Sequence, residues 1–207
     1  MKILNLYAGI GGNRRYWGDK HKITAVENHK TIAKIYQDFW TNDEVIVADA
    51  HTFLKENFRD YDFIWSSPPC PSHSRVRFAF QGKDNPIFPD LKLYEEIIFL
   101  KHYFKGKYCV ENVKSYYDPL IKPQVIGRHF YWCNFRIPYI KVNPGVHDKG
   151  IKALSKRKQL DISKYRDIDK REVLRNCVEP EVGEHILKWA FYKKESLTDL
   201  LNKEGNL

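Results

Sequence analysis

The sequence lacks any apolar run long enough to cross a membrane, and it is poor in cysteine. A transmembrane helix needs about 20 consecutive apolar residues, and no stretch of the 207 residues approaches that length. The residues after Met1 also lack the apolar core and cleavage site of a secretory signal. The four cysteines form no C-x-x-C pair, which is typical of reduced thiols and not of a disulfide framework. We therefore expect a cytoplasmic protein without a membrane segment.

Acidic residues are in deficit, and the deficit is local. The chain has 35 Lys and Arg against 26 Asp and Glu, a net charge of +9. Residues 139–176 hold eleven of the basic and five of the acidic side chains, so two thirds of the excess charge lies there. A merely soluble basic surface would account for the total, but this concentration favours a surface that contacts phosphates of a polyanionic partner.

Strands alternate with helices in the first half of the chain, and there is no internal repeat. The pattern predicts strands at Lys2–Tyr7, Lys22–Val26, Glu44–Ala48, Tyr61–Trp65 and Lys107–Val110, and helices at Thr31–Trp40 and Leu91–Phe104. Further on it predicts a strand or hairpin at Arg128–Pro138, an irregular segment at 139–170 and a helix at Glu181–Tyr192. This order is typical of an α/β fold with a doubly wound, mostly parallel sheet. We predict a core at 1–138, a very small basic lobe at 139–173 and a segment at 174–207 that returns to the core.

The side chains with useful chemistry follow the predicted strands. Gly9–Gly12 follow the first strand, and Glu27 and Asp49 follow the second and third. Cys70 comes after the fourth strand and Glu111 after the fifth. Because ligands bind at the carboxyl ends of parallel strands in α/β sheets, we expect these residues to form one site.

The glycine turn Tyr7–Gly12 (YAGIGG) suits a backbone that closely approaches a ligand. The third glycine of the dinucleotide-binding motif is absent, since Arg14 stands in its place, which favours a nucleoside cofactor without a pyrophosphate. Glu27 could accept hydrogen bonds from ribose hydroxyls, and Asp49 from an adenine amino group. Each acid alone is more typical of a surface carboxylate or a helix cap. Together, at successive strand ends, they favour a cofactor site.

Cys70 lies in a loop framed by Pro68, Pro69 and Pro71. Proline fixes φ and restricts the residue before it, so this loop can hold a nucleophile rigidly. A structural, buried cysteine is the other interpretation. Cys70 and His73 also resemble half of the zinc-deaminase motif, but no histidine in the sequence is followed two residues later by Glu, as that chemistry requires. We predict a nucleophile that works without a metal.

Glu111 begins a Glu-Asn-Val turn beside the predicted strand end of Cys70. A carboxyl group that faces a thiol makes a nucleophile–acid pair. A carboxylic acid can donate to N3 of cytosine while it accepts from N4, which makes C6 of the ring open to thiolate attack. We expect the pKa of Glu111 to be raised when such a base is bound.

The motifs Tyr7–Gly12, Pro68-Pro69-Cys70 and Glu111-Asn112-Val113, in this order, resemble those of the cytosine-C5 DNA methyltransferase family. Arg175–Pro180 resembles the family's late G-N-x-V-P element. The resemblance implies a Rossmann-like fold, S-adenosylmethionine as methyl donor, S-adenosylhomocysteine as product and no metal. It also implies a monomer that acts on DNA in the cytoplasm of a bacterial or phage-infected cell, in restriction–modification or phage biology.

The resemblance also implies roles for individual residues. Cys70 attacks C6 of a flipped cytosine, Glu111 engages N3 and N4, and Arg128 contacts the base. We expect Arg128 or local dipoles to lower the pKa of Cys70. The implied cofactor contacts are Tyr7, Ala8, Gly9, Ile10, Gly11, Gly12, Glu27, Asn28, Asp49, Ala50, Pro69 and Asn176.

The sequence departs from the family at several points. Asn5 stands where the family usually has Asp, Pro71 stands where it has Gln, and the large target-recognition domain is reduced to about 35 residues near 139–173. Three other functions stay open: a non-catalytic DNA-binding module, methylation of cytosine in RNA or a free nucleotide, and a nicotinamide oxidoreductase. Intact Cys70 and Glu111 disfavour the first, the basic segment disfavours a free nucleotide, and the Cys70 loop disfavours the third.

Overall fold

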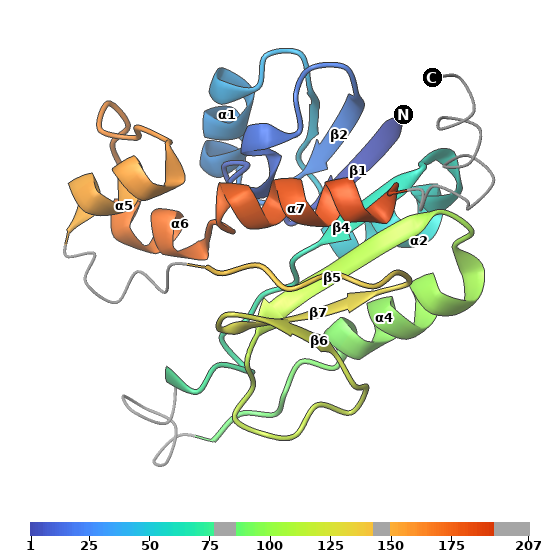
Figure 1. Ribbon diagram of the computed structural model, residues 1–207. Helices are drawn as coiled ribbons and strands as arrows, with labels where there is room; N and C mark the ends of the chain where they lie inside the picture. Colours follow the sequence, from blue (N-terminus) through green and yellow to red (C-terminus); the bar gives the residue numbers. More distant parts are fainter. Residues whose placement is uncertain (77–85, 143–149, 193–207) are drawn as a thin grey trace, which may run out of the picture.

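The computed structural model describes residues 1–76, 86–142 and 150–192 (Figure 1). These residues form an α/β fold around a seven-stranded sheet with the order β3-β2-β1-β4-β5-β7-β6. The strands are β1 (Lys2–Leu6), β2 (Lys22–Val26), β3 (Glu44–Ile46), β4 (Phe63–Ser66), β5 (Lys107–Val113), β6 (Gln124–Ile126) and β7 (His129–Cys133). Strands β1 to β5 are parallel, and β7 and β6 complete the sheet antiparallel. The predicted mostly parallel sheet is therefore confirmed.

Helices cover both faces of this sheet. They are α1 (Lys30–Phe39), α2 (Ala50–Asn57), α4 (Lys92–Tyr103), α5 (Ile151–Lys158), α6 (Lys170–Asn176) and α7 (Pro180–Ala190), with short 3-10 turns η1 (Asn13–Tyr16) and η2 (Phe58–Asp60). Side chains alternate along each strand, so Leu4 of β1 packs on the side of α2 and α4 while Ile3 faces α7. Among the described residues, no helix is both long and apolar enough to span a bilayer.

Strand β5 is longer than predicted, because it pairs with the antiparallel strand β7. The predicted strand stops at Val110, but β5 continues to Val113. The added residues pair with β7, with Glu111 opposite Tyr131 and Val113 opposite His129. Glu111 therefore belongs to the sheet and does not sit in a turn beyond it.

The predicted basic lobe contains helices that the sequence did not indicate. Helix α5 lies in the segment expected to be irregular, and α6 begins after Asp169, whose carboxylate accepts from Arg171 N and Glu172 N at 2.9 Å. Leu154 and Leu174 are buried with Ile10 of the glycine turn. The lobe thus packs on the glycine-turn end of the core. Residues 143–149 of this lobe, and 193–207 of the predicted C-terminal segment, lie outside the described residues.

Candidate active site

A cavity of about 450 Å³ opens at the carboxyl ends of the parallel strands. Eleven of the fifteen predicted site residues line it: Tyr7, Ala8, Gly9, Ile10, Gly12, Glu27, Asn28, Pro69, Cys70, Glu111 and Asn176. The other four, Gly11, Asp49, Ala50 and Arg128, are absent from its lining. The structure thus brings together residues from five separate parts of the chain.

The residues of the glycine turn have two roles, because some line the cavity and others allow close packing beneath the turn. Tyr7, Gly9 and Gly11 all have positive φ, at 53°, 55° and 80°. A β-carbon on Gly9 would have nothing within 4 Å, so this glycine leaves open space at the cavity wall. A β-carbon on Gly11 would overlap the Trp40 ring, whose Nε1 donates to Ile10 O at 3.1 Å. Gly11 therefore permits packing under the turn and does not face the cavity.

The two acids expected to hold a cofactor differ in the structure. Both oxygens of Glu27 are fixed at the cavity, because Oε2 accepts from Gly9 N at 3.0 Å and Oε1 from His29 N at 2.9 Å. Asp49 instead caps α2, where its Oδ1 accepts from Thr52 N at 2.8 Å. This hydrogen bond lowers the pKa of Asp49. The helix cap is the role that the structure gives Asp49, and Ala50 is buried behind it in the first turn of α2.

The Cys70 loop is tied to the neighbouring strand. Asn112 Nδ2, at the end of β5, donates to Pro68 O at 3.0 Å. The Cys70 carbonyl accepts from His73 N at 2.9 Å and from Ser74 N at 3.0 Å, which forms a tight turn after Cys70. These bonds fix the half-buried Cys70 relative to Glu111, the side chain next to Asn112.

The surroundings of Cys70 disfavour its thiolate form. Burial, and then the negative charge of Glu111, raise its pKa to about 11. The expectation of a lowered pKa is therefore wrong for this state. Its physical reason is that Arg128 is exposed on the turn between β6 and β7 and does not line the cavity.

The residue next to Arg128 reaches the cavity instead. His129 lines it, and its Nε2 lies 3.8 Å from Glu111 Oε1. The sequence did not indicate His129, because the arginine one position earlier matched the expected chemistry. Nor did it indicate Glu172 and Arg175, which line the cavity from α6.

A buried carboxylate behind the cavity was missed as well. Glu96 of α4 is 1% exposed and accepts from Tyr7 Oη at 2.6 Å and from Ser66 Oγ at 2.5 Å. His51 Nδ1 of α2 lies 3.0 Å from the same carboxylate. Burial and Glu96 raise the pKa of Tyr7, so this phenol remains a donor. Glu96 thus joins the carboxyl ends of β1 and β4, from which the glycine turn and the Cys70 loop extend.

The sequence does contain a feature that points to Glu96. Leu93, Ile97 and Leu100 repeat at helical spacing and form the buried side of α4. Glu96 lies within this apolar stripe, and a buried acid is rare unless it has partners.

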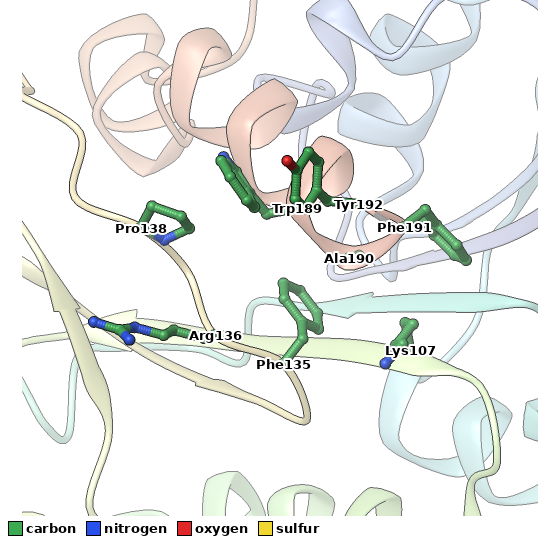
Figure 2. A pocket seen from close by; sticks show the side chains of 8 residues that line it. All are labelled: Lys107, Phe135, Arg136, Pro138, Trp189, Ala190, Phe191 and Tyr192. Carbon is green, nitrogen blue, oxygen red and sulfur yellow. The ribbon is translucent and has the colours of Figure 1, made fainter. Parts of the chain in front are cut away.

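A second cavity, of about 500 Å³, opens at the other end of β5 (Figure 2). The rings of Phe135, Trp189 and Tyr192 gather there beside Lys107 and Arg136, and the Trp189 and Tyr192 ring centroids are 4.4 Å apart. Among the residues that the structure describes, no cysteine, acid or histidine lines it. In the described ranges, no group of three or more His, Cys, Asp or Glu side chains is arranged to hold a metal ion. The thiol of Cys70 and the carboxyl group of Glu111 in the first cavity make it the candidate active site.

The chain is similar to known proteins in family and in fold. The model of the family "C-5 cytosine-specific DNA methylase" matches residues 1–119, while no curated protein matches the chain. The solved structure of the methyltransferase EhMeth from Entamoeba histolytica is similar in fold, with a TM-score of 0.57 and 10% identity over 92% of this chain and 98% of that one. A mutant of DNMT2 from Spodoptera frugiperda is 25% identical over 55% of this chain and 35% of that one, with a TM-score of 0.38.

Proposed function

Since this chain belongs to the C-5 cytosine-specific DNA methylase family, we propose that it transfers a methyl group from S-adenosylmethionine to C5 of a flipped cytosine in DNA through a covalent bond to Cys70. The observation that carries this proposal is that Cys70 and Glu111 line one cavity with the glycine turn. A thiol and a carboxyl group in this arrangement suit addition to C6 of a cytosine ring.

The cofactor end of the cavity has the features that a nucleoside ligand needs. Gly9 leaves open space at positive φ, and the Glu27 carboxylate is held in place by two backbone N–H groups. A carboxylate has about four acceptor positions, so Glu27 retains capacity for ribose hydroxyls. Asn28 and Asn176 line the same cavity, whose volume lies within the range of about 300–1,000 Å³ of small-molecule sites. When bound, S-adenosylmethionine supplies an electrophilic methyl group and leaves as S-adenosylhomocysteine.

The base must leave the DNA helix to reach Cys70, because C6 and C5 of a stacked cytosine are out of reach of a buried thiol. Glu111 then faces the Watson–Crick edge of the flipped base, where its protonated carboxyl group donates a hydrogen bond to N3 and accepts one from N4. A neutral Glu111 no longer opposes ionisation of Cys70, so binding of the base lowers the pKa of the thiol from its high value in the free enzyme.

The covalent cycle can be followed as electron pairs. The Cys70 thiol loses its proton to solvent and the thiolate forms a bond to C6. The C5=C6 pair moves toward C5 and N3, where the proton shared with Glu111 holds it. After C5 has gained the methyl group, a base takes the C5 proton. The C5=C6 bond forms again, the bond from C6 to sulfur breaks, and the N3 proton returns to Glu111.

The test is methyl transfer from a labelled donor to DNA by the wild type and by Cys70→Ala. We expect label at C5 of cytosine with the wild type and none with Cys70→Ala. Cys133→Ala is the matched control, because Cys133 is also partly buried but lies on β7 outside the cavity. Transfer that survives Cys70→Ala would exclude the covalent mechanism.

The substrate class is tested by competition. Unlabelled duplex DNA, single-stranded DNA, RNA and free cytidine nucleotide are each added to the labelled reaction. DNA should compete most strongly, and stronger competition by RNA or nucleotide would reassign the substrate. Bisulfite sequencing of DNA from cells that express the chain then gives the modified position and its sequence context.

A further inference from the structure

The cavity needs a hydrogen-bond donor beside Glu111 if the reaction is cytosine methylation, and this inference rests on that proposed function. The Watson–Crick edge of cytosine presents N4, N3 and O2 in a row. Glu111 serves N4 and N3, which leaves O2 facing whatever lies next to the carboxylate. Negative charge spreads onto O2 as the thiolate adds to C6, so a donor placed there stabilises the transition state more than the bound substrate.

The strand register decides which residue lies next to Glu111. In the antiparallel pair of β5 and β7, Val113 is opposite His129 and Glu111 is opposite Tyr131. Opposite residues share a face of the sheet, and so do residues two apart on one strand. His129 is therefore the diagonal neighbour of Glu111 on the cavity face.

The contact between these two groups leaves both available to a substrate. His129 Nε2 and Glu111 Oε1 are 3.8 Å apart, which is too long for a hydrogen bond. The His129 side chain is 39% exposed while that of Glu111 is 9% exposed, so the imidazole stands nearer to the open side of the cavity. Within the described residues, the Glu111 carboxylate accepts no other hydrogen bond.

The other basic residues nearby do not meet these conditions. Arg128 follows Gly127 in the β6–β7 turn, is exposed, and contacts Lys114 N through its backbone oxygen at 3.0 Å. Arg175 lines the cavity from α6, next to the predicted cofactor residue Asn176, and no ion pair joins it to Glu111 in the described part of the chain.

We propose that His129 is a catalytic residue that donates a hydrogen bond from its imidazole to O2 of the target cytosine, in place of Arg128. Glu111 and His129 together then bind the three atoms of the Watson–Crick edge. Loss of one such donor to a developing oxyanion costs about 100- to 1,000-fold in kcat.

The experiment compares His129→Ala, His129→Gln and Arg128→Ala in the full chain. His102→Ala is the matched control, since His102 is an exposed histidine at the end of α4. For each variant we would measure single-turnover methyl transfer, the KM for DNA, the Kd of S-adenosylmethionine by calorimetry, and covalent trapping on DNA that contains 5-fluorocytosine. The fluorinated base keeps the adduct because fluorine at C5 cannot leave as a proton does.

We expect His129→Ala to lower the transfer and trapping rates about 100- to 1,000-fold with an unchanged cofactor Kd. His129→Gln should recover about tenfold or more, since its amide N–H can donate to the same oxygen. Arg128→Ala should lose less than about tenfold, and His102→Ala should match the wild type.

Three results would overturn the role of His129 while the proposed function stands. They are His129→Ala within about threefold of the wild type, a loss in Arg128→Ala that exceeds that in His129→Ala, and a weakened cofactor Kd in His129→Ala that points to a structural role. A wild type that neither methylates nor is trapped by any cytosine substrate would instead overturn the proposed function, and the role of His129 with it.

Discussion

The parallel and the antiparallel parts of the sheet contribute lining residues to the cavity from opposite strand ends. The parallel strands β1, β2, β4 and β5 supply it from the residues at and beyond their carboxyl ends, such as Glu27 and Cys70. The antiparallel strand β7 supplies it from its first residue, His129. The carboxyl end of a parallel strand is followed by a loop, and the residues of this loop can be reactive side chains. At the start of an antiparallel strand, the register alone decides which side chain faces inward.

This difference affects how each part tolerates change. The loop residue Cys70 keeps its place through the bonds of His73 N and Ser74 N to its own carbonyl and through the bond of Asn112 to Pro68 O in the same loop. His129 keeps its place through the pairing of β7 with β5 and with β6, where a shift by one residue would turn Arg128 inward. Substitutions in the two parts should therefore fail in different ways.

The largest effect is expected for Glu111→Gln, at the strand where the two parts meet. The acid is lost, so kcat should fall about 100- to 10,000-fold. Removal of the charge that helps to raise the Cys70 pKa should lower this pKa, so alkylation of the free enzyme by iodoacetamide should become faster at pH 8. Rates of methyl transfer and of alkylation across pH 7–11 measure both. If alkylation slows as well, Glu111 does not act on the thiol by its charge.

The next effect concerns the parallel part alone. Glu96→Leu removes a buried carboxylate with partners on three other elements, and breaking such a network costs about 3–5 kcal/mol. Urea unfolding measures this loss. Tyr7→Phe is the control that removes a single hydrogen bond, which should cost about 1 kcal/mol. A loss below about 1 kcal/mol in Glu96→Leu would show that Glu96 does not hold the strand ends together.

A similar or smaller loss is expected beyond the parallel part, in the α5–α6 segment. Leu174 is fully buried against the glycine-turn core, so Leu174→Ala should destabilise the fold by about 2–5 kcal/mol. It should also weaken binding of S-adenosylmethionine, because Leu174 positions the end of α6 that lines the cavity. Calorimetry gives the Kd. An unchanged Kd would make the segment independent of the cofactor end.

The smallest effect is a pH dependence in the parallel part. The hydrogen bond to Glu96 raises the pKa of His51 above its usual value. The stability from this pair is therefore complete below about pH 6.5, the pKa of an unfolded histidine, and is lost as the pH rises through the higher folded value. The difference in unfolding free energy between the wild type and His51→Ala should shrink from pH 6 to pH 8.5. A difference that grows over this range would contradict the pairing.

The sequence predicts the parallel part of the sheet well, because residues close together in the sequence specify each of its strands. Each strand is a short apolar run, and Glu27, Cys70 and Glu111 lie just past the residues that the alternation marks. The fold and the family were both predictable from these runs and the motifs between them.

The remainder depends on contacts between distant residues. The sequence from Gln124 to Cys133 does not indicate whether residue 128 or residue 129 faces Glu111, because the pairing of β7 with β5 determines which side chain points inward. Helix α5 is short and strongly polar, with Leu154 among its few apolar residues, so its periodicity is weak until packing selects it. Asp49 satisfied the expected cofactor pattern, but the start of α2 next to it uses its carboxylate as a cap.

The packing of α7 against η1, the short helix after the glycine turn, also affects the order in which parts of the chain fold. Trp17 Nε1 donates to Gly183 O at 3.1 Å across 166 residues of sequence, and a β-carbon on Gly183 would overlap the Asn13 backbone. Contacts so distant in sequence close late in folding, because the loop entropy must first be overcome. During synthesis, Cys70 leaves the ribosome more than a hundred residues before α7 does. The Cys70 loop is therefore synthesised well before α7, the helix that packs against the backbone of Asn13 in the cavity wall.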